Sequence, residues 1–163
     1  MKLYLAGPDV FRLNAEVWFE EAKALCRQHG HQALVPLDGV ETTPGGIYRA
    51  NIELIRQADV VLANLNAFRG CEPDSGTCFE VGFAAALGKP VIGYVESDAP
   101  IVARVADSQG GSLGKTNGRP VDANGWFIED FGLPLNLMLA VPATLVVGGL
   151  PEALMALGQV SPG

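Results

Sequence analysis

The segment 59–65, DVVLANL, is the feature that most constrains the fold. It is rich in β-branched residues and almost continuously apolar, which is typical of a parallel strand covered by helices on both faces. Shorter apolar runs predict four further strands, at residues 3–6, 33–35, 90–94 and 144–147. The sequence therefore predicts a sheet of about five parallel strands.

Helical patterns separate these strands. They cover residues 14–26, 47–57 and 76–87, a short segment at 135–139, and a last helix that begins at Pro151. Residues 96–132 are rich in glycine and predict a long loop. Strand and helix otherwise alternate, which predicts an α/β fold: a three-layer α/β/α sandwich of the Rossmann or flavodoxin-like type, formed by residues 1–163 as a single domain.

Composition excludes several function classes. The net charge of −7 argues against a broad nucleic-acid-binding surface, which needs clustered Lys and Arg. No apolar stretch approaches the roughly 18–20 residues that a membrane span requires, and the start of the chain lacks the apolar core of a signal peptide. The three cysteines have no metal-ligand spacing. We expect a cytoplasmic protein with reduced thiols, no metal site and no cofactor.

Acidic side chains gather after the predicted strands. Asp9 and Phe11 follow the first strand, Asp38 follows the second, and Asp74 lies in the loop after the third. In open parallel sheets, ligands bind beyond the carboxyl ends of the strands. Aromatic residues beside carboxylates suit a flat, hydrogen-bonding ring such as a nucleobase.

Motifs for phosphate cradles and serine nucleophiles are absent from the sequence. There is no GxGxxG or GxxxxGK[ST] loop and no GxSxG elbow, so acid–base and nucleophilic chemistry falls to carboxylates. Glu80 lies near the start of the predicted helix 76–87 in an apolar stretch. The helix dipole, worth about 0.3–1 kcal/mol, should keep Glu80 ionised and available as a nucleophile. The alternative is an ordinary acidic residue in the first turns of a helix.

Three ordered motifs resemble the nucleoside 2-deoxyribosyltransferases, and in particular their trypanosomatid and bacterial branch. They are YLAGP at 4–8 with Phe11, EPDSGTCFEVG at 72–82, and LPLNLML at 133–139. The resemblance spans nearly the whole chain. It implies a Rossmann-like homo-oligomer with a shared active site, which moves 2-deoxyribose between nucleobases without a cofactor.

The resemblance also implies roles for individual residues. Glu80 matches the nucleophile, and Tyr4 matches the tyrosine whose hydroxyl holds that carboxylate. Asp74 matches an aspartate of the substrate pocket, and Phe11 matches an aromatic residue at the base site. Asn136 matches an asparagine that a neighbouring subunit offers to the 5′-hydroxyl of the sugar.

Asn51 departs from the family pattern, because many members carry an aspartate at this position. An amide can hydrogen-bond a base but cannot transfer a proton to it. The proton donor for the leaving base is therefore left open among Asp9, Asp38 and Asp74.

The chemistry of the residues agrees with the resemblance. A fixed carboxylate can stabilise oxocarbenium charge and bond to C1′, as in a retaining double displacement, with hydrolysis as a side reaction. We expect deoxynucleosides and free nucleobases as the binding partners. Two alternatives are a hydrolase of 2′-deoxynucleoside 5′-monophosphates and a non-catalytic nucleoside-sensing module. Asp9 after the first strand would repel a phosphate, which favours the neutral nucleoside.

Overall fold

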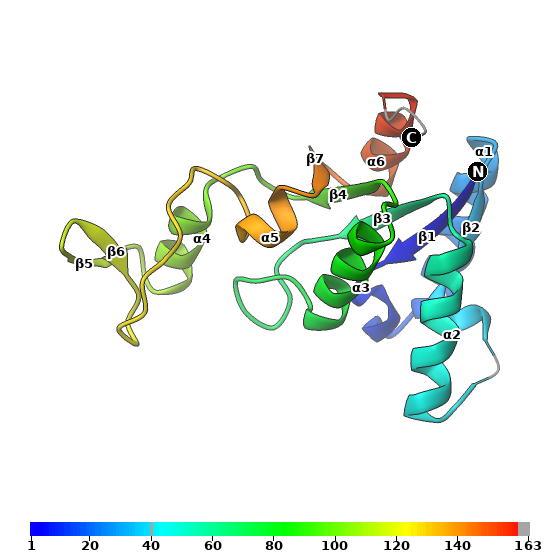
Figure 1. Cartoon of the computed structure of the whole chain (residues 1–163), viewed down its shortest axis with the longest axis horizontal. Coiled ribbons are helices and arrows are strands. Elements are labelled where there is room, and N and C mark those ends of the chain that lie inside the picture. Colours follow the sequence, from blue (N-terminus) through cyan, green and yellow to red (C-terminus); the bar gives the residue numbers. More distant parts are fainter. Residues whose placement is uncertain (40, 160–163) are drawn as a thin grey trace.

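A five-stranded parallel sheet forms the centre of the protein in a computed structural model (Figure 1). The structure describes residues 1–39 and 41–159. The strand order is β2-β1-β3-β4-β7, and every neighbouring pair is parallel. The strands are β1 (Lys2–Ala6), β2 (Gln32–Leu34), β3 (Val60–Asn64), β4 (Val91–Val95) and β7 (Ala143–Val147). The predicted α/β fold and parallel sheet are confirmed.

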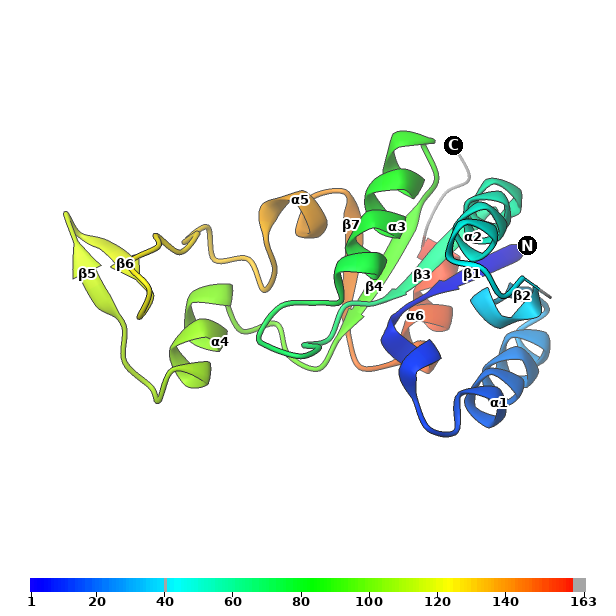
Figure 2. The same cartoon turned by 90° about the horizontal axis from the view of Figure 1, so that it is seen from below.

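Helices cover both faces of this sheet, which makes three layers (Figure 2). One face carries α1 (Ala15–Gln28) and α6 (Leu150–Ala156). The other carries α2 (Pro44–Gln57), α3 (Ser75–Ala86) and the short α5 (Leu137–Ala140). Short 3-10 turns follow β1, β2 and α6, at Pro8–Phe11, Pro36–Asp38 and Leu157–Gln159.

Alternation along β1 decides which side chains reach which layer. Leu3 and Leu5 pack with α1 and α6, whereas Tyr4 and Ala6 pack with α2 and α3. This follows from the period of two along a strand, which sends successive side chains to opposite faces. Tyr4 is fully buried and lies on the face that α3 covers.

The strand order changes direction beside β1. The chain runs from β1 outward to the edge strand β2 and then returns to form β3 on the other side of β1. In sheets with this order, the first connection packs on one face and the next on the opposite face, which opens a crevice at the carboxyl ends of the two central strands. The site described below lies there.

Residues 96–136 project away from the sheet (Figures 1 and 2). The prediction of a loop over 96–132 was wrong in part, because this region contains α4 (Ile101–Ser108) and a hairpin of β5 (Gly114–Thr116) and β6 (Arg119–Val121). A small apolar cluster of Ile101, Val105 and Ile128 gives the region its own packing. The cluster explains why this region is folded although its sequence has no long apolar periodicity.

No helix within residues 1–39 and 41–159 is long and apolar enough to cross a membrane.

Candidate active site

A cavity of about 410 Å³ opens at the carboxyl end of β1, between α2 and α3. Gly7 and Phe11 line it from the segment after β1, and Pro36 lines it from the segment after β2. The surface around the cavity is mainly apolar. It has the size and the character of a small-molecule site, in which a few polar groups orient a ligand.

The start of α3 brings two carboxylates to this cavity. Asp74 is the N-cap residue, and its Oδ2 accepts from the Thr77 backbone N–H at 2.9 Å and from the Thr77 hydroxyl at 3.1 Å. Capping of this kind fixes the first turn of a helix. Glu80 follows Thr77 by three residues and therefore lies on the same helix face, so that both line the cavity.

Glu80 is held by a hydrogen bond from the strand beneath it. Tyr4 Oη donates to Glu80 Oε1 at 2.6 Å. Burial raises the pKa of Glu80 from its ordinary value to about 7; the Tyr4 hydrogen bond opposes that rise and the negative charge of Asp74 adds to it. The sequence predicted an ionised Glu80 from the helix dipole alone, whereas the cost of burial is the larger effect. Near neutral pH, both the protonated and the ionised form of Glu80 are therefore populated.

The opposite wall of the cavity belongs to α2. Ile47 and Asn51 lie one helical turn apart and both line the cavity. The Asn51 Oδ1 atom is buried and has no hydrogen-bond partner among the described residues. A buried amide oxygen without a donor costs free energy, and a bound ligand with an N–H group at this point would remove that cost.

Phe11 forms an aromatic edge to the cavity. It stacks on Phe68, with the ring centroids 5.5 Å apart and the planes 16° from parallel. The Arg69 guanidinium lies 5.1 Å from the Phe11 centroid and 4.7 Å from that of Phe68. These contacts hold Phe11 in position although it is more than half exposed.

Asp9 lies close by but does not line this cavity. It is buried, and it accepts from Arg12 Nε at 2.6 Å and from Asn64 Nδ2 at 2.9 Å. Gly7 allows this approach, because a Cβ at Gly7 would lie 2.7 Å from Asp9 Oδ2 and 2.8 Å from the Asn64 Cβ. Asp9 instead borders two shallower cavities next to Arg12. The structure assigns it to the support of the turn after β1.

The Asp38 side chain also makes its contacts away from the cavity. Its Oδ1 pairs with Lys23 Nζ at 2.6 Å, and its Oδ2 accepts from the Val35 backbone N–H at 3.2 Å. Neither contact reaches the cavity. The structure therefore brings together Tyr4, Glu80, Asp74, Phe11 and Asn51, and it leaves out Asp9 and Asp38.

Asn136 does not line the cavity of its own chain. It is the N-cap of α5: its Oδ1 accepts from the Met138 backbone N–H at 2.9 Å, and its Nδ2 donates to Glu129 Oε1 at 2.7 Å. These bonds fix the amide in one orientation at the start of α5.

Glu41 lines the cavity and was missed by the reasoning from sequence. It lies in the turn-rich segment before α2, where no motif marks it. Its proximity to Thr43, the N-cap of α2, is the one local signal that points to a helix start.

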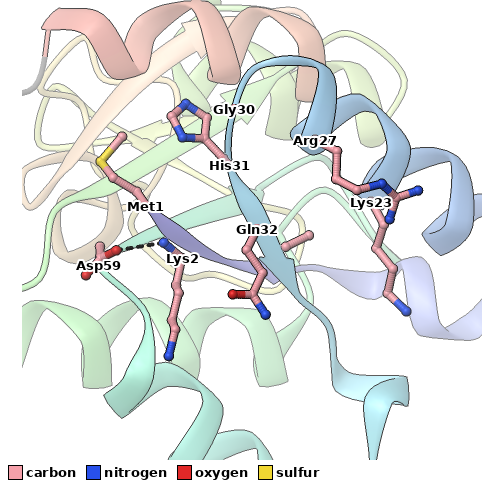
Figure 3. Close-up of a pocket in the computed structure, with 9 residues that line it drawn as sticks. Met1, Lys2, Lys23, Arg27, Gly30, His31, Gln32 and Asp59 are labelled. Carbon is pink, nitrogen blue, oxygen red and sulfur yellow. Dashed lines mark hydrogen bonds between the residues drawn. The ribbon is translucent and has the colours of Figure 1, made fainter.

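A larger cavity, of about 710 Å³, lies at the amino ends of the strands (Figure 3). Lys2, Arg27 and His31 line it, and the Lys2 backbone N–H donates to Asp59 at 2.6 Å. This edge is opposite to the one at which parallel sheets bind ligands. Within the described residues, no group of three or more His, Cys, Asp or Glu side chains is placed to hold a metal ion.

Comparison with known proteins identifies relatives over most of the chain. A family model described as nucleoside 2-deoxyribosyltransferase matches residues 3–138. The structure of 2-desoxiribosyltransferase from Leishmania mexicana superposes with a TM-score of 0.76 at 34% identity, covering 96% of this chain and 95% of that one. An uncharacterized protein of Schizosaccharomyces pombe is 30% identical over 155 residues, which is 83% of this chain and 74% of that protein. A conserved protein from Enterococcus faecalis shares the fold, with a TM-score of 0.59 at 18% identity, over 98% of each chain.

Proposed function

Because the chain belongs to the nucleoside 2-deoxyribosyltransferase family, we propose that it transfers 2-deoxyribose from one nucleobase to another through a covalent intermediate on Glu80. Family membership supports nucleoside deoxyribosyltransferase or related N-glycosidase activity. Exchange of one nucleobase for another is our more specific proposal within this range of activities. It makes the protein an enzyme of nucleoside salvage that needs only deoxynucleosides and free bases.

In the first half of the reaction, Glu80 acts as the nucleophile. Its free carboxylate oxygen attacks C1′ of the deoxyribose while the bond from C1′ to the base nitrogen breaks, and the bonding electrons leave with the base. Tyr4 donates to Oε1 at 2.6 Å and so directs the other oxygen toward the cavity. The absence of a 2′-hydroxyl lets oxocarbenium charge develop readily at C1′.

In the second half, the nitrogen of an incoming base attacks C1′ and Glu80 leaves. Two displacements at one carbon retain the configuration of the sugar, as in retaining glycosidases. Water can take the place of the second base, which gives slow hydrolysis. Phe11 and Asn51 line the cavity where a flat base fits, and Asp74 lies beside Glu80, within reach of the sugar hydroxyls.

The observation that carries this proposal is the environment of Glu80. It faces a mainly apolar cavity, and its hydrogen-bond donor is a neutral hydroxyl rather than a cation. A carboxylate paired with Lys or Arg would be held in place by charge and would be a weak nucleophile. With a pKa of about 7, Glu80 is ionised in a substantial fraction of molecules near neutral pH, and its raised basicity favours attack on C1′.

We extend the proposal to a homo-oligomer with a shared active site. Met138 on α5 and Val141, which follows α5, are 72% and 73% exposed. These apolar side chains lie close in the chain to Asn136, which is held by hydrogen bonds and does not line its own cavity. A second copy packed here would bring Asn136 to the sugar in the partner's cavity. A monodisperse monomer with full transfer activity in light scattering would contradict this.

Product analysis tests the reaction. The protein is incubated with a deoxynucleoside, with and without a second free base, and the products are separated by chromatography. We expect the new deoxynucleoside to form only with the second base present. With a 2-fluoro-2-deoxy nucleoside, which slows breakdown of the intermediate, intact-mass spectrometry should show one sugar adduct, which peptide mapping places on Glu80.

Other outcomes would exclude base exchange. Release of free base with no new nucleoside would indicate an N-glycosidase. Binding without turnover would indicate a sensing module. An adduct on Asp74 would mean that Asp74, and not Glu80, is the nucleophile.

A further inference from the structure

Cleavage of an N-glycosidic bond needs a proton as well as a nucleophile. A nucleobase that leaves without a proton departs as an anion and leaves slowly, so a group that protonates it in the transition state accelerates the step. The described side chains around the cavity include three carboxyl groups, those of Glu80, Asp74 and Glu41. The Asn51 amide, which also lines the cavity, hydrogen-bonds but does not transfer protons at neutral pH.

Two of the three carboxyl groups have other tasks. Glu80 is the nucleophile that bonds to C1′ in the proposed reaction. Asp74 Oδ2 accepts both the N–H and the hydroxyl of Thr77, which ties it to the end of α3 beside Glu80. It is therefore held at the start of α3, on the same side of the cavity as Glu80.

Glu41 also lines the cavity, from the segment just before the first turn of α2. Gly46 is buried in that turn, and the Glu41 carboxyl carbon lies 2.8 Å from the point that a Cβ of residue 46 would occupy. Only glycine leaves room for the carboxyl group there. Ile47 and Asn51 line the same cavity from α2, so Glu41 and the Asn51 amide both face the space that a ligand would occupy.

Position and exposure suit Glu41 to proton exchange. Glu80 lines the cavity from α3, and Asn51 lines it from α2, so a base on a sugar bound at Glu80 has room to extend toward Asn51 and Glu41. Glu41 is solvent-exposed, so water also reaches its carboxyl group. Lys23 pairs with Asp38 rather than with Glu41.

We propose, on the basis of the function proposed above, that Glu41 is the acid and base that serves the nucleobase. As the bond from C1′ to the base nitrogen breaks, the Glu41 carboxylic acid gives its proton to a second basic atom of the leaving base, and the base departs neutral. The Glu41 carboxylate then accepts a proton from the incoming base as its nitrogen bonds to C1′. One proton leaves Glu41 and one returns in each exchange, so no other reactant is consumed.

The test uses Glu41→Gln with a series of deoxynucleosides whose leaving bases differ in acidity. The rate of glycosyl-enzyme formation is measured for each by rapid quench. We expect losses of about 10²–10⁴-fold for the least acidic base, as is usual when a general acid is removed. The loss should shrink steadily as the base becomes more acidic, because such a base leaves without help. A residue that only shapes the loop would slow every donor alike.

Matched variants separate this role from a structural one. Glu53 is exposed on α2 away from the cavity, so Glu53→Gln should leave all rates unchanged. Glu41→Asp keeps a carboxyl group and should retain part of the activity on the least acidic base. Gly46→Ala should displace the Glu41 carboxyl group and reproduce the acidity-dependent loss, whereas Gly45→Ala meets only Arg49 Nη1, at 3.4 Å, and should not.

The outcomes are distinct. If the wild-type protein exchanges bases and Glu41→Gln shows the same dependence on leaving-base acidity as the wild type, the role of Glu41 is overturned and the proposed function stands. If the wild-type protein transfers no sugar from any donor, the proposed function fails, and the role of Glu41 fails with it.

Discussion

Two neighbouring regions at the carboxyl end of β1 each hold an acidic side chain in opposite ways. In the cavity between α2 and α3, Glu80 has one neutral partner, the Tyr4 hydroxyl at 2.6 Å. In the turn after β1, Asp9 has a cationic partner, Arg12 at 2.6 Å, and an amide partner, Asn64 at 2.9 Å. Tyr4, the partner of Glu80, lies on β1, and Asp9 lies in the turn that directly follows this strand.

The comparison shows that partners, more than burial, decide what a carboxylate does. Asp9 is 3% exposed, yet its negative charge is balanced by the Arg12 guanidinium and its oxygens are filled. Glu80 is less completely buried and has no cation in hydrogen-bond contact, and its pKa rises to about 7. The first arrangement supports a turn. The second leaves an oxygen free for chemistry.

Among the single substitutions considered, Glu80→Gln should cause the largest loss of activity. The amide can still accept a hydrogen bond from Tyr4 and binds nucleoside, but it carries no charge and forms no stable ester. We expect turnover to fall by several orders of magnitude with little change in nucleoside affinity, because the lost interactions act mainly in the transition state. Steady-state kinetics and isothermal titration measure the two effects. Near-normal turnover would refute the assignment of Glu80.

The same variant should be more stable than the wild type above neutral pH. The folded pKa of Glu80, about 7, lies above its ordinary value of 4.5, so its contribution to stability is full below pH 4.5 and is lost as the pH rises through 7. Glutamine does not titrate. The advantage of Glu80→Gln in the free energy of unfolding should therefore grow between pH 5 and pH 8, by on the order of 2 kcal/mol. Urea denaturation at both pH values measures it.

Tyr4→Phe should shift the pH dependence rather than abolish activity. The Tyr4 hydroxyl lowers the pKa of Glu80, so its removal should raise that pKa further and move the acid limb of kcat/KM to higher pH. We expect a loss of roughly 10- to 100-fold at pH 7, of which a part returns by pH 9. An unchanged pH profile would mean that Tyr4 only fills space in the core.

The fold was largely predictable because the sheet obeys simple patterns. The run at 59–65 is apolar on both faces, and β3 occupies Val60–Asn64. The region 96–132 was not predictable, because α4 has eight residues and the hairpin strands have three each. Elements this short owe their structure to contacts such as those of Arg104 with the carbonyl oxygens of Cys71 and Pro134, which no local pattern reveals.

The acidic residues of the site were only partly predictable. Position after a strand placed Asp9, Asp38 and Asp74 at the correct edge of the sheet. It could not tell which of them would face a cavity, because that depends on Arg12, Lys23 and Thr77 as partners. Glu41 precedes a helix in a turn-rich segment and has no spacing relation to Glu80, so only the packing of α2 against α3 brings the two to one cavity.

Asp9→Ala should damage stability and spare the chemical step. It leaves the Asn64 amide and the Arg12 guanidinium without their acceptor, and Asn64 is buried. Because the Arg12 side chain is 48% exposed and can be solvated, we expect a loss of about 1–2 kcal/mol in the free energy of unfolding. Chemical denaturation measures it, and kcat per folded molecule should stay within a few-fold of the wild type. A collapse of kcat in a folded variant would place Asp9 in the catalytic machinery.

Asp38→Asn should have the smallest effect on stability and activity of the substitutions compared. Asp38 pairs with Lys23 at 2.6 Å on the surface, and its hydrogen bond is the largest cause of the raised pKa of Lys23. An asparagine oxygen can still accept from the Val35 backbone N–H, and Lys23 retains Glu20 at 3.0 Å. Exposed ion pairs contribute roughly 0–1 kcal/mol and weaken with salt, so the change in unfolding free energy should stay below about 1 kcal/mol and shrink further at high ionic strength. Activity should be unchanged, because neither Asp38 contact reaches the cavity. A tenfold fall in kcat with unaltered stability would show that position after a strand, and not the partner, decides the role of a carboxylate in this protein.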